Sequence, residues 1–369
     1  MRALTCGRAA LVLAGFLALG CGASFDPPTE VKSLRVLGVE KDQPYALPGE
    51  DVNLSLLWYD GTPEGTTGSR RVQIQWLGGC LNPPADSYQG CFGQYAAALT
   101  DPGTAAAAGF ASGSGPDFRV HLPTEAEAGA RGPVIHPSTD PRLPAYGLSY
   151  VFFSVCAGEL VPRLDDKNFP LRCIDETGAD VGPNDFVLGY TAIYMFAPDP
   201  AGQPYRNADP VIGGFVVGEK DVTDAACFGA DCLGTCDDTG CVNQFEPEDV
   251  DCATWPTLCI PSCKDDGDVR KCPANEIALG IDPSTFEPDQ VTNDAYGTNY
   301  GEQMWIDYYA TSGNFKSGTK LLNDATTGYN SQHFTDFYAP SSTGLVRVWV
   351  VVHDNRGGVS WAGTTLKIE

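Results

Sequence analysis

The chain has 369 residues and is strongly acidic, with 47 aspartate and glutamate residues against 23 lysine and arginine residues and a formal net charge of −24. Such a chain lacks the basic surface that releases counterions when a protein binds nucleic acid or anionic lipid, which argues against both partners. Intrinsic disorder does not explain the charge, because aromatic and β-branched residues are plentiful and alternate with polar ones. The length is sufficient for two domains.

The first twenty residues have the features of an export signal. Arg2 and Arg8 precede an apolar run over residues 9–19, which ends in small residues. This run is too short to span a bilayer, which favours a cleaved signal peptide over residues 1–20. Its removal leaves 21 basic residues against 47 acidic ones, a net charge near −26.

Residues 18–21, Ala-Leu-Gly-Cys, resemble the bacterial lipobox, although the commonest pattern has Leu where this chain has Ala18. The resemblance implies that Cys21 carries a thioether-linked diacylglycerol and that residues 21–30 form a lipidated tether. Gly22 in place of Asp after the lipid site implies, by the enterobacterial sorting rule, the outer membrane or cell surface. An ordinary secretory signal with an incidental cysteine is the alternative.

The mature chain contains twelve further cysteines. An even number of cysteines in an exported chain predicts disulfide bonds. Zinc is the alternative, but the chain has no Cys-x-x-Cys pair and no histidine close to the cysteine cluster in sequence. The predicted disulfide cysteines are Cys80, Cys91, Cys156, Cys173, Cys227, Cys232, Cys236, Cys241, Cys252, Cys259, Cys263 and Cys272.

Four of these cysteines lie in the first half of the chain. Local pairs, Cys80 with Cys91 and Cys156 with Cys173, are favoured because each closes a short loop. A bridge from Cys80 to Cys156 between two sheets is the alternative. The other eight cysteines admit 105 pairings, and none is preferred.

Hydrophobic periodicity predicts strands and almost no helix. Segments with alternating or continuous apolar residues give six or seven strands between residues 31 and 200, the number in one immunoglobulin-like β-sandwich. They are 34–39, 52–58, 72–76, 118–122, 149–156 and 186–196.

A second set of strands predicts a second immunoglobulin-like sandwich over residues 205–369. Residues 345–353 and 359–368, separated by Asp-Asn-Arg-Gly-Gly, are the strongest predicted hairpin. The fold class is therefore all-β, with two tandem sandwiches. The further predicted strands are 211–217, 277–281 and 304–309.

Two segments lack this periodicity. Residues 96–116 are rich in Ala, Gly, Ser and Pro and predict a long surface loop, since Gly103, Gly109 and Gly113 would interrupt a helix. Residues 227–272 hold eight cysteines and almost no apolar pattern, so we expect a disulfide-rich insert of the second domain.

Both ends of the mature chain resemble a group of bacterial surface proteins. Residues 31–39, followed by Leu47-Pro48-Gly49-Glu50 and a strand, look like the opening of immunoglobulin-like domains in uncharacterised surface lipoproteins of myxobacteria and related deltaproteobacteria. Residues 350–361 resemble the last hairpin of their second, PKD-like or immunoglobulin-like domain. The resemblance implies a fold and a location but no activity, and it covers the middle of the chain poorly.

Catalytic motifs are weak. Gly358-Val359-Ser360-Trp361-Ala362 lacks the final glycine of a nucleophile elbow and lies in a predicted hairpin. His353 and Asp354 near Ser360 suggest a triad, but adjacent residues of a strand point in opposite directions. No phosphate loop, dinucleotide fingerprint or HExxH motif occurs in the sequence. We therefore expect no enzymatic activity and no catalytic residues.

Calcium is the one cofactor with some support, near Asp265, Asp266 and Asp268. Their spacing matches no EF-hand, so a solvated acidic loop is favoured and no cofactor is expected. Aromatic residues near predicted loops are candidates for a sugar-binding platform, although packing explains most aromatic residues in sandwiches. They are Tyr88, Phe92, Tyr95 and Tyr329.

Together these features predict a non-catalytic surface binding, adhesion or structural module, anchored in the membrane by lipid. The long loop and the insert at 227–272 are the expected contact surfaces for a protein or glycan partner. An envelope hydrolase that uses acidic residues, or a calcium-dependent glycan-binding protein, is the alternative.

Overall fold

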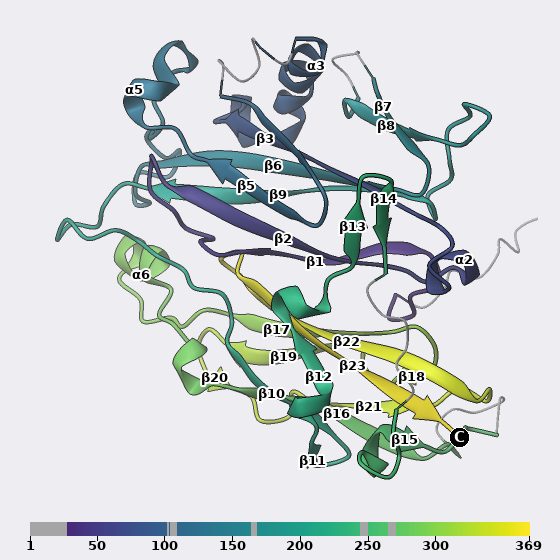
Figure 1. Ribbon diagram of the computed structural model, residues 1–369. Coiled ribbons are helices and arrows are strands. Elements are labelled where there is room, and N and C mark those ends of the chain that lie inside the picture. The colour runs from purple at the N-terminus through teal and green to yellow at the C-terminus, as the bar shows by residue number, and fades with distance from the viewer. Residues whose placement is uncertain (1–27, 102, 104–108, 164–167, 244–249, 265–270) are drawn as a thin grey trace, which may run out of the picture.

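The computed structural model describes residues 28–101, 103, 109–163, 168–243, 250–264 and 271–369. The predicted signal peptide and lipid site lie outside these residues. Within them the protein consists of mainly antiparallel sheets with a few short helices, as Figure 1 shows. The all-β prediction is confirmed. No helix of the described part is long and apolar enough to cross a membrane.

Two facing sheets form what we call the first sandwich. Alternate side chains of both sheets meet in one core, in which Trp76 is fully buried and stacks on Phe118 with 5.6 Å between ring centroids. One sheet, in the order β1-β2-β5, contains β1 (Leu34–Lys41), β2 (Asp51–Asp60) and β5 (Asp117–His121). The other, in the order β4-β3-β6-β9, contains β4 (Ala111–Ser114), β3 (Gln73–Leu81), β6 (Tyr146–Cys156) and β9 (Phe186–Phe196).

The second sandwich also has two facing sheets around a separate core. One sheet, in the order β11-β10-β16-β21-β18, contains β11 (Lys220–Asp221), β10 (Ile212–Val217), β16 (Ala274–Ile281), β21 (Thr335–Tyr338) and β18 (Asn314–Phe315). The other runs β12-β23-β22-β17-β19-β20 and contains β12 (Ala226–Phe228), β23 (Val359–Ile368), β22 (Gly344–Asp354), β17 (Met304–Ala310), β19 (Thr319–Asp324) and β20 (Gly328–Tyr329), with β15 (Cys259–Ile260) beside β23.

The two sandwiches share one pairing pattern. In each, seven principal strands of the described chain, numbered in chain order, pair as 1-2-5 in one sheet and 4-3-6-7 in the other. In the first sandwich these strands are β1, β2, β3, β4, β5, β6 and β9. In the second they are β10, β16, β17, β19, β21, β22 and β23. The cysteine-rich segment therefore occupies the connection between principal strands 1 and 2 of the second sandwich.

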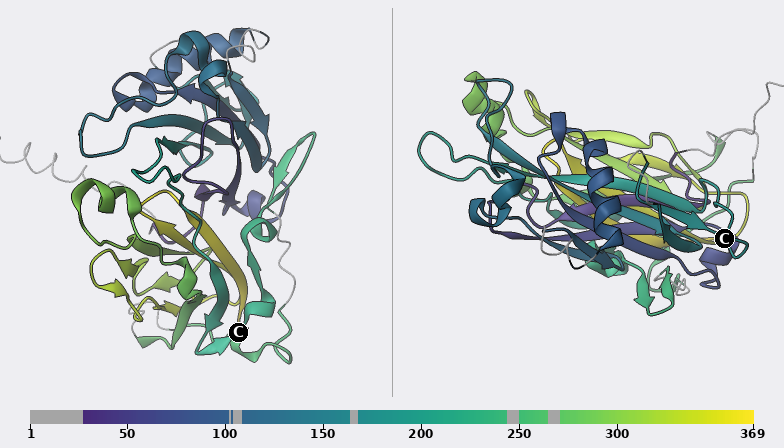
Figure 2. Two further views of the ribbon diagram at one scale, coloured as in Figure 1. Left: turned by 90° about the vertical axis from the view of Figure 1, so that its left-hand side faces the viewer. Right: turned by 90° about the horizontal axis from the view of Figure 1, so that it is seen from above.

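The sandwiches are stacked, so that the sheet β1-β2-β5 lies against the sheet that contains β22 and β23 (Figures 1 and 2). We call the apolar layer between them the junction. Leu37 and Leu57 of the first sandwich meet Trp349, Val351 and Trp361 of the second there, all of them buried. Strand β22 is thus buried on both faces, which explains why its sequence is apolar at almost every position.

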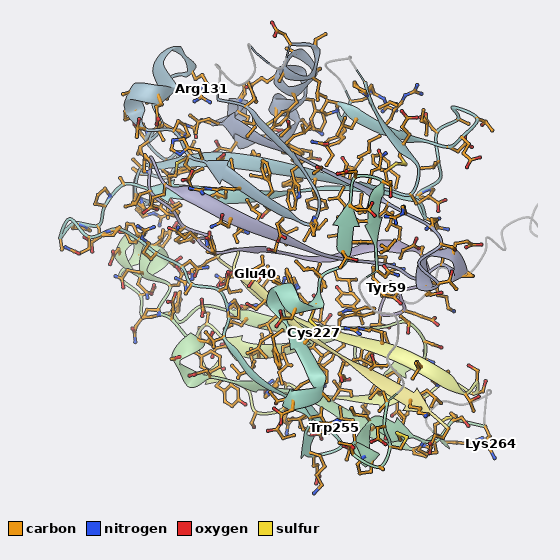
Figure 3. All side chains as sticks on the ribbon, in the orientation of Figure 1. Glu40, Tyr59, Arg131, Cys227, Trp255 and Lys264 are labelled. Atoms are coloured by element: carbon orange, nitrogen blue, oxygen red, sulfur yellow. A yellow bond between two sulfur atoms is a disulfide. The ribbon has the colours of Figure 1, made fainter. Side chains whose placement is uncertain are left out.

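Backbone packing at the junction is close. The register of β1 against β2 shifts between Val36 and Gly38, and a Cβ atom at Gly38 would lie 3.2 Å from the Trp361 ring. The ring of Tyr59 contacts that of Trp349 from the opposite sheet, with centroids 4.6 Å apart and the planes tilted by 59°. Figure 3, in which Tyr59 and Cys227 are labelled, shows side chains filling this space. The junction is therefore a third hydrophobic core, and it joins the two sandwiches through buried apolar contacts.

The prediction of a long loop over residues 96–116 is wrong in part. Its beginning belongs to helix α3 (Phe92–Thr100) and residues 111–114 form β4. The helix forms because Tyr95 and Ala96 are buried on the outer face of the sheet, where the Tyr95 hydroxyl donates to the Leu77 carbonyl oxygen at 3.1 Å. The other α-helices are α2 (Pro63–Thr66), α5 (Glu125–Ala128) and α6 (Gln290–Tyr296).

All twelve cysteines after Cys21 form disulfides, which excludes the zinc alternative for them. In the first sandwich Cys80 pairs with Cys91 and Cys156 with Cys173, the two local pairs favoured from the sequence, and not Cys80 with Cys156. The insert also contains only sequential pairs: Cys227–Cys232, Cys236–Cys241, Cys252–Cys259 and Cys263–Cys272. A small extra hairpin, β7 (Glu159–Pro162) and β8 (Leu171–Ile174), carries Cys173.

The insert is not a free display surface, contrary to expectation. Its strands β12 and β15 extend the sheet of the second sandwich, while its hairpin of β13 (Thr235–Asp237) and β14 (Gly240–Val242) reaches the first (Figure 1). There the backbones of Val72 and Cys241 exchange hydrogen bonds of 2.9 and 2.7 Å, and the Asn243 amide donates to the Asp60 carbonyl oxygen at 2.9 Å. Leu233 is buried in the junction. The insert therefore clamps the two sandwiches together.

The end of the predicted tether is also fixed. Residues 21–27 lie outside the described residues, but Ala310 of β17 donates to the carbonyl oxygen of Thr29 and accepts from the amide of Val31. Val31 is fully buried in the junction. A tether over residues 21–30 is thus too long by two residues, because Thr29 and Glu30 already belong to the fold.

Candidate functional site

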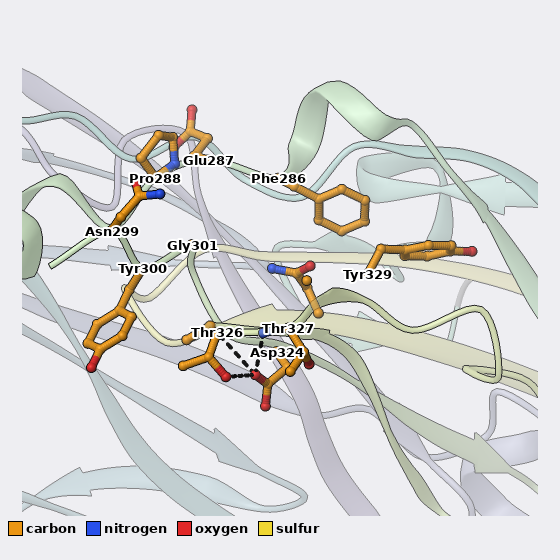
Figure 4. Close-up of a pocket in the computed structure, with 13 residues that line it drawn as sticks. Phe286, Glu287, Pro288, Asn299, Tyr300, Gly301, Asp324, Thr326, Thr327 and Tyr329 are labelled. Atoms are coloured by element: carbon orange, nitrogen blue, oxygen red, sulfur yellow. Dashed lines mark hydrogen bonds between the residues drawn. The ribbon is translucent and has the colours of Figure 1, made fainter.

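A groove of about 450 Å³ lies at the edge of the second sandwich, and we call it the edge groove. Three segments far apart in the sequence line it. They are residues 286–288 after β16, residues 299–301 before β17, and residues 323–329 at the β19–β20 turn (Figure 4). The segments are joined by backbone hydrogen bonds from Gly301 to Ala325 and from Glu302 to Glu287, each 2.9 Å long.

The segment before β17 is held by helix α6. The Asp289 side chain caps the start of the helix by accepting from the Thr292 amide at 3.2 Å, and Gly297, with φ at +65°, ends it. Asn293 then accepts from the Tyr300 amide at 2.7 Å and donates to the Tyr300 carbonyl oxygen at 2.8 Å. Asn293 therefore holds both the amide and the carbonyl group of Tyr300 in place.

The β19–β20 turn is fixed by its own aspartate. The Asp324 carboxylate accepts from the Thr326 hydroxyl at 2.6 Å and from the amides of Thr326 and Thr327, each at 2.9 Å. These bonds, drawn in Figure 4, lower the pKa of Asp324 to about 2. The hydrogen bonds of the carboxylate stay within the turn and hold it rigid. The turn forms the floor of the groove.

Aromatic side chains flank this floor. Tyr300 lies on one side and Phe286 and Tyr329 on the other (Figure 4). Tyr329 and Tyr300 are 51% and 40% exposed, and the rings of Phe286 and Tyr329 are 5.4 Å apart. Asn323, whose amide donates to the Glu302 carbonyl oxygen at 2.6 Å, adds a buried polar group to the lining. The groove thus offers flat apolar faces beside hydroxyl and amide groups.

Of the four aromatic residues singled out in the sequence, the structure brings only Tyr329 to this groove. Tyr95 is 1% exposed in the core beneath α3, and Phe92 packs edge-on against Phe152. Tyr88 stacks on Tyr190 with 4.4 Å between ring centroids. These three rings serve packing, in line with the usual role of aromatic residues in sandwiches.

Two glutamates converge beside the groove, but on a shared arginine. Arg356 Nη2 donates to Glu287 at 2.7 Å and also to Glu302. Arg356 and Glu302 are almost completely buried, so each charge requires the other. Their role in the fold is to tie the β22–β23 hairpin to the groove segments.

The suggested triad does not assemble. His353 stacks on Trp305 with ring centroids 5.3 Å apart, and its Nε2 lies 3.4 Å from the Asp307 carboxylate. Asp354 points to the other side, where it accepts from the Asn207 amide at 3.0 Å and from the Gly358 amide at 2.9 Å. In the sheet register Ser360 lies opposite Val352. The three residues therefore serve different neighbours.

Among the described residues, one group of potential metal ligands lies close together: Cys252, Cys259 and Glu369. Its two sulfur atoms are joined in a disulfide and cannot act as thiolates. The calcium candidates Asp265, Asp266 and Asp268 lie outside the described residues.

No protein-family model matches the sequence, and a search of curated proteins finds no relative. Sequence reasoning missed Tyr300 and the groove floor, because the three lining segments have no common motif and meet only through the fold. Asp324-Ala325-Thr326-Thr327-Gly328 is the one local signal, since it is typical of a rigid aspartate turn.

Proposed function

We propose that the protein is a non-catalytic surface module that binds an uncharged glycan in the edge groove. The observation that carries the proposal is the pair of exposed tyrosines, Tyr300 and Tyr329, on opposite sides of a rigid polar floor. A sugar ring has an apolar face that packs on an aromatic ring and a rim of hydroxyls that require donors and acceptors. An open groove suits a chain of such rings better than an enclosed pocket does.

Charge narrows the class of glycan. The net charge of −24 repels acidic polysaccharides at moderate ionic strength. Within the groove, Asp324 is bonded in its turn and Glu287 is bonded to Arg356. Neither carboxylate is placed as a free general acid, which supports binding over the hydrolase alternative.

Affinity electrophoresis of the mature chain through gels that contain a neutral β-glucan, mannan or galactomannan tests this proposal. At least one polymer should retard the wild-type protein, and Tyr300→Ala/Tyr329→Ala should abolish the retardation. Tyr190→Ala is the matched control, because Tyr190 is 46% exposed on the first sandwich. Equal migration of wild-type and double variant in every gel, or release of reducing sugar by the wild-type protein, would contradict the proposal.

We also propose that the chain is a lipoprotein anchored through Cys21 at the outer membrane or cell surface. Six disulfides support export to an oxidising compartment. Metabolic labelling with a palmitate analogue should label the wild-type protein, and Cys21→Ser should lose both the label and the membrane fraction. An unlabelled wild-type protein in the medium would favour simple secretion.

The shared strand order supports an immunoglobulin-like assignment for both sandwiches. Sheets of principal strands 1-2-5 and 4-3-6-7 correspond to the immunoglobulin pattern with the fourth strand placed beside the third. We propose, as part of the same assignment, that the chain is related to the deltaproteobacterial surface lipoproteins that its two ends resemble. An experimental structure with a different strand order in either sandwich would contradict it.

A further inference from the structure

A second recess, of about 330 Å³, lies where the two sandwiches meet, and we call it the junction recess. The first sandwich contributes Lys41 at the end of β1, Tyr45, and residues of β9. The second contributes Asn355, Arg356 and Gly357 from the β22–β23 turn. The φ of Gly357, +97°, favours glycine at this turn, and a Cβ there would lie in ordinary contact with Lys41 Nζ, 3.6 Å away.

Lys41 is the unusual group in this recess. Its side chain is 2% exposed, and in the described part of the chain its ammonium makes a single hydrogen bond, to the Thr191 hydroxyl at 2.8 Å. A buried lysine usually has a direct carboxylate partner, because desolvation of its charge is costly. Here a neutral hydroxyl takes that place, so the amine is held in position with two of its hydrogens uncommitted.

The walls favour a flat apolar ligand. Tyr194 and Phe196 of β9 stack nearly parallel with ring centroids 5.7 Å apart, and Tyr45 meets Phe196 edge-on at 4.9 Å. Arg356 also lines the recess, and its buried Nε has no acceptor among the described residues. The recess therefore combines aromatic faces with a sequestered amine.

Charges near Lys41 come from both sandwiches and from the segment that joins them. Asp209 and Asp354 both act on Lys41 electrostatically and raise its pKa. The other titratable groups around it, Arg356, Tyr45 and Tyr194, line the same recess. Burial outweighs the electrostatic effect of Asp209 and Asp354 and lowers the pKa of Lys41 to about 8. At pH 7.5 roughly a quarter of such amines are neutral, against about one in a thousand for an ordinary lysine.

We propose that the junction recess is a site for a small aromatic aldehyde or ketone and that Lys41 Nζ binds it covalently as an imine. The neutral amine adds to the carbonyl carbon to give a carbinolamine, which loses its former carbonyl oxygen as water when the C=N bond forms. Both amine hydrogens leave in that water, so no oxidant or reductant is consumed. The bond is reversible by hydrolysis.

Reductive trapping tests the proposal on the full mature chain. Benzaldehyde with cyanoborohydride at pH 7.5, followed by peptide mass spectrometry, should benzylate Lys41 at least about tenfold faster than exposed Lys220. In guanidinium chloride the two rates should become equal. Lys41→Arg should lose the label at this position, and Thr191→Val should keep it, because the recess and the amine remain.

The ratio of Lys41 labelling to Lys220 labelling should be largest below about pH 8 and fall at higher pH, because the fraction of neutral amine at Lys41 levels off there while that of an ordinary lysine continues to rise. A native Lys41 that reacts no faster than Lys220, or a preference that survives unfolding, would overturn the proposal. Glycan retardation in the edge groove is a separate readout, since Lys41 does not line that groove.

Discussion

The junction and the edge groove differ in burial and in the kind of backbone that forms them. The junction buries two tryptophans and a fully enclosed strand between sheets, together with ionisable groups such as Asp209 and Lys41 at its end. The edge groove is built from turns, and its aromatic residues Tyr300 and Tyr329 remain exposed. Changes at the junction should therefore alter stability, whereas changes in the groove should alter binding alone.

Trp349→Ala should give the largest effect. Trp349 is 1% exposed and contacts Tyr59 across the junction, so its removal leaves a large cavity. We expect a loss of about 3–5 kcal/mol in the free energy of unfolding. Urea denaturation followed by circular dichroism measures it. A loss below about 1 kcal/mol would show that the sandwiches are not fused as described.

Asp209→Asn should change how stability depends on pH. Burial raises the pKa of Asp209 to about 8, whereas an unfolded aspartate has a pKa near 3.9. Between these values the native state holds a proton that the unfolded state has lost, so this group's stabilising contribution falls as pH rises from about 4 to 8. The slope is at most about 1.4 kcal/mol per pH unit.

The asparagine variant should therefore gain stability relative to wild type across that range. Paired denaturation curves at pH 5, 6, 7 and 8 measure the difference, and the subtraction cancels the other carboxylates. A stability difference that does not change with pH would show that the pKa of Asp209 is the same in the folded and unfolded states, which would contradict its burial.

Cys236→Ala/Cys241→Ala tests the clamp. The pair closes the β13–β14 hairpin, and Cys241 is buried in the first sandwich. We expect a loss of about 2 kcal/mol, the amount typical of a short disulfide loop. If the insert only decorated the surface, the change would leave the denaturation midpoint where it is.

Tyr329→Ala should have the smallest effect on the fold and a clear effect on binding. Loss of one exposed stacking face should cost about 1 kcal/mol of glycan affinity, roughly fivefold, with an unchanged melting temperature. Isothermal titration with the retarding glycan measures the first quantity and calorimetric melting the second. Tyr190→Ala, at a position 46% exposed on the first sandwich, should leave the glycan affinity unchanged because Tyr190 does not line the groove, although loss of its stacking on Tyr88 should lower the melting temperature.

The same contrast explains what the sequence could reveal. Alternation along β2 and the apolar run of β22 predict these strands, because period-2 patterning follows directly from the geometry of a strand. The nearly continuous apolar sequence of β22 also carried a sign of the junction, since a strand with one face in water has alternating polar residues.

The insert and the groove could not be found in this way. Residues 227–272 pack through disulfides and short strands without periodicity, so their role as a clamp has no local pattern. Tyr300 reaches the groove because Asn293 and helix α6 place it there, opposite a turn about 25 residues further along the chain. Helix α3 was missed because buried Tyr95, not Ala propensity, holds it.

Hydrogen–deuterium exchange of the mature chain with and without the retarding glycan tests glycan binding in the edge groove most directly. We predict that glycan slows exchange at residues 299–301 and 323–329 and leaves β9 and the insert hairpin unchanged. Protection confined to the first sandwich or to the insert, with none at the β19–β20 turn, would contradict the account.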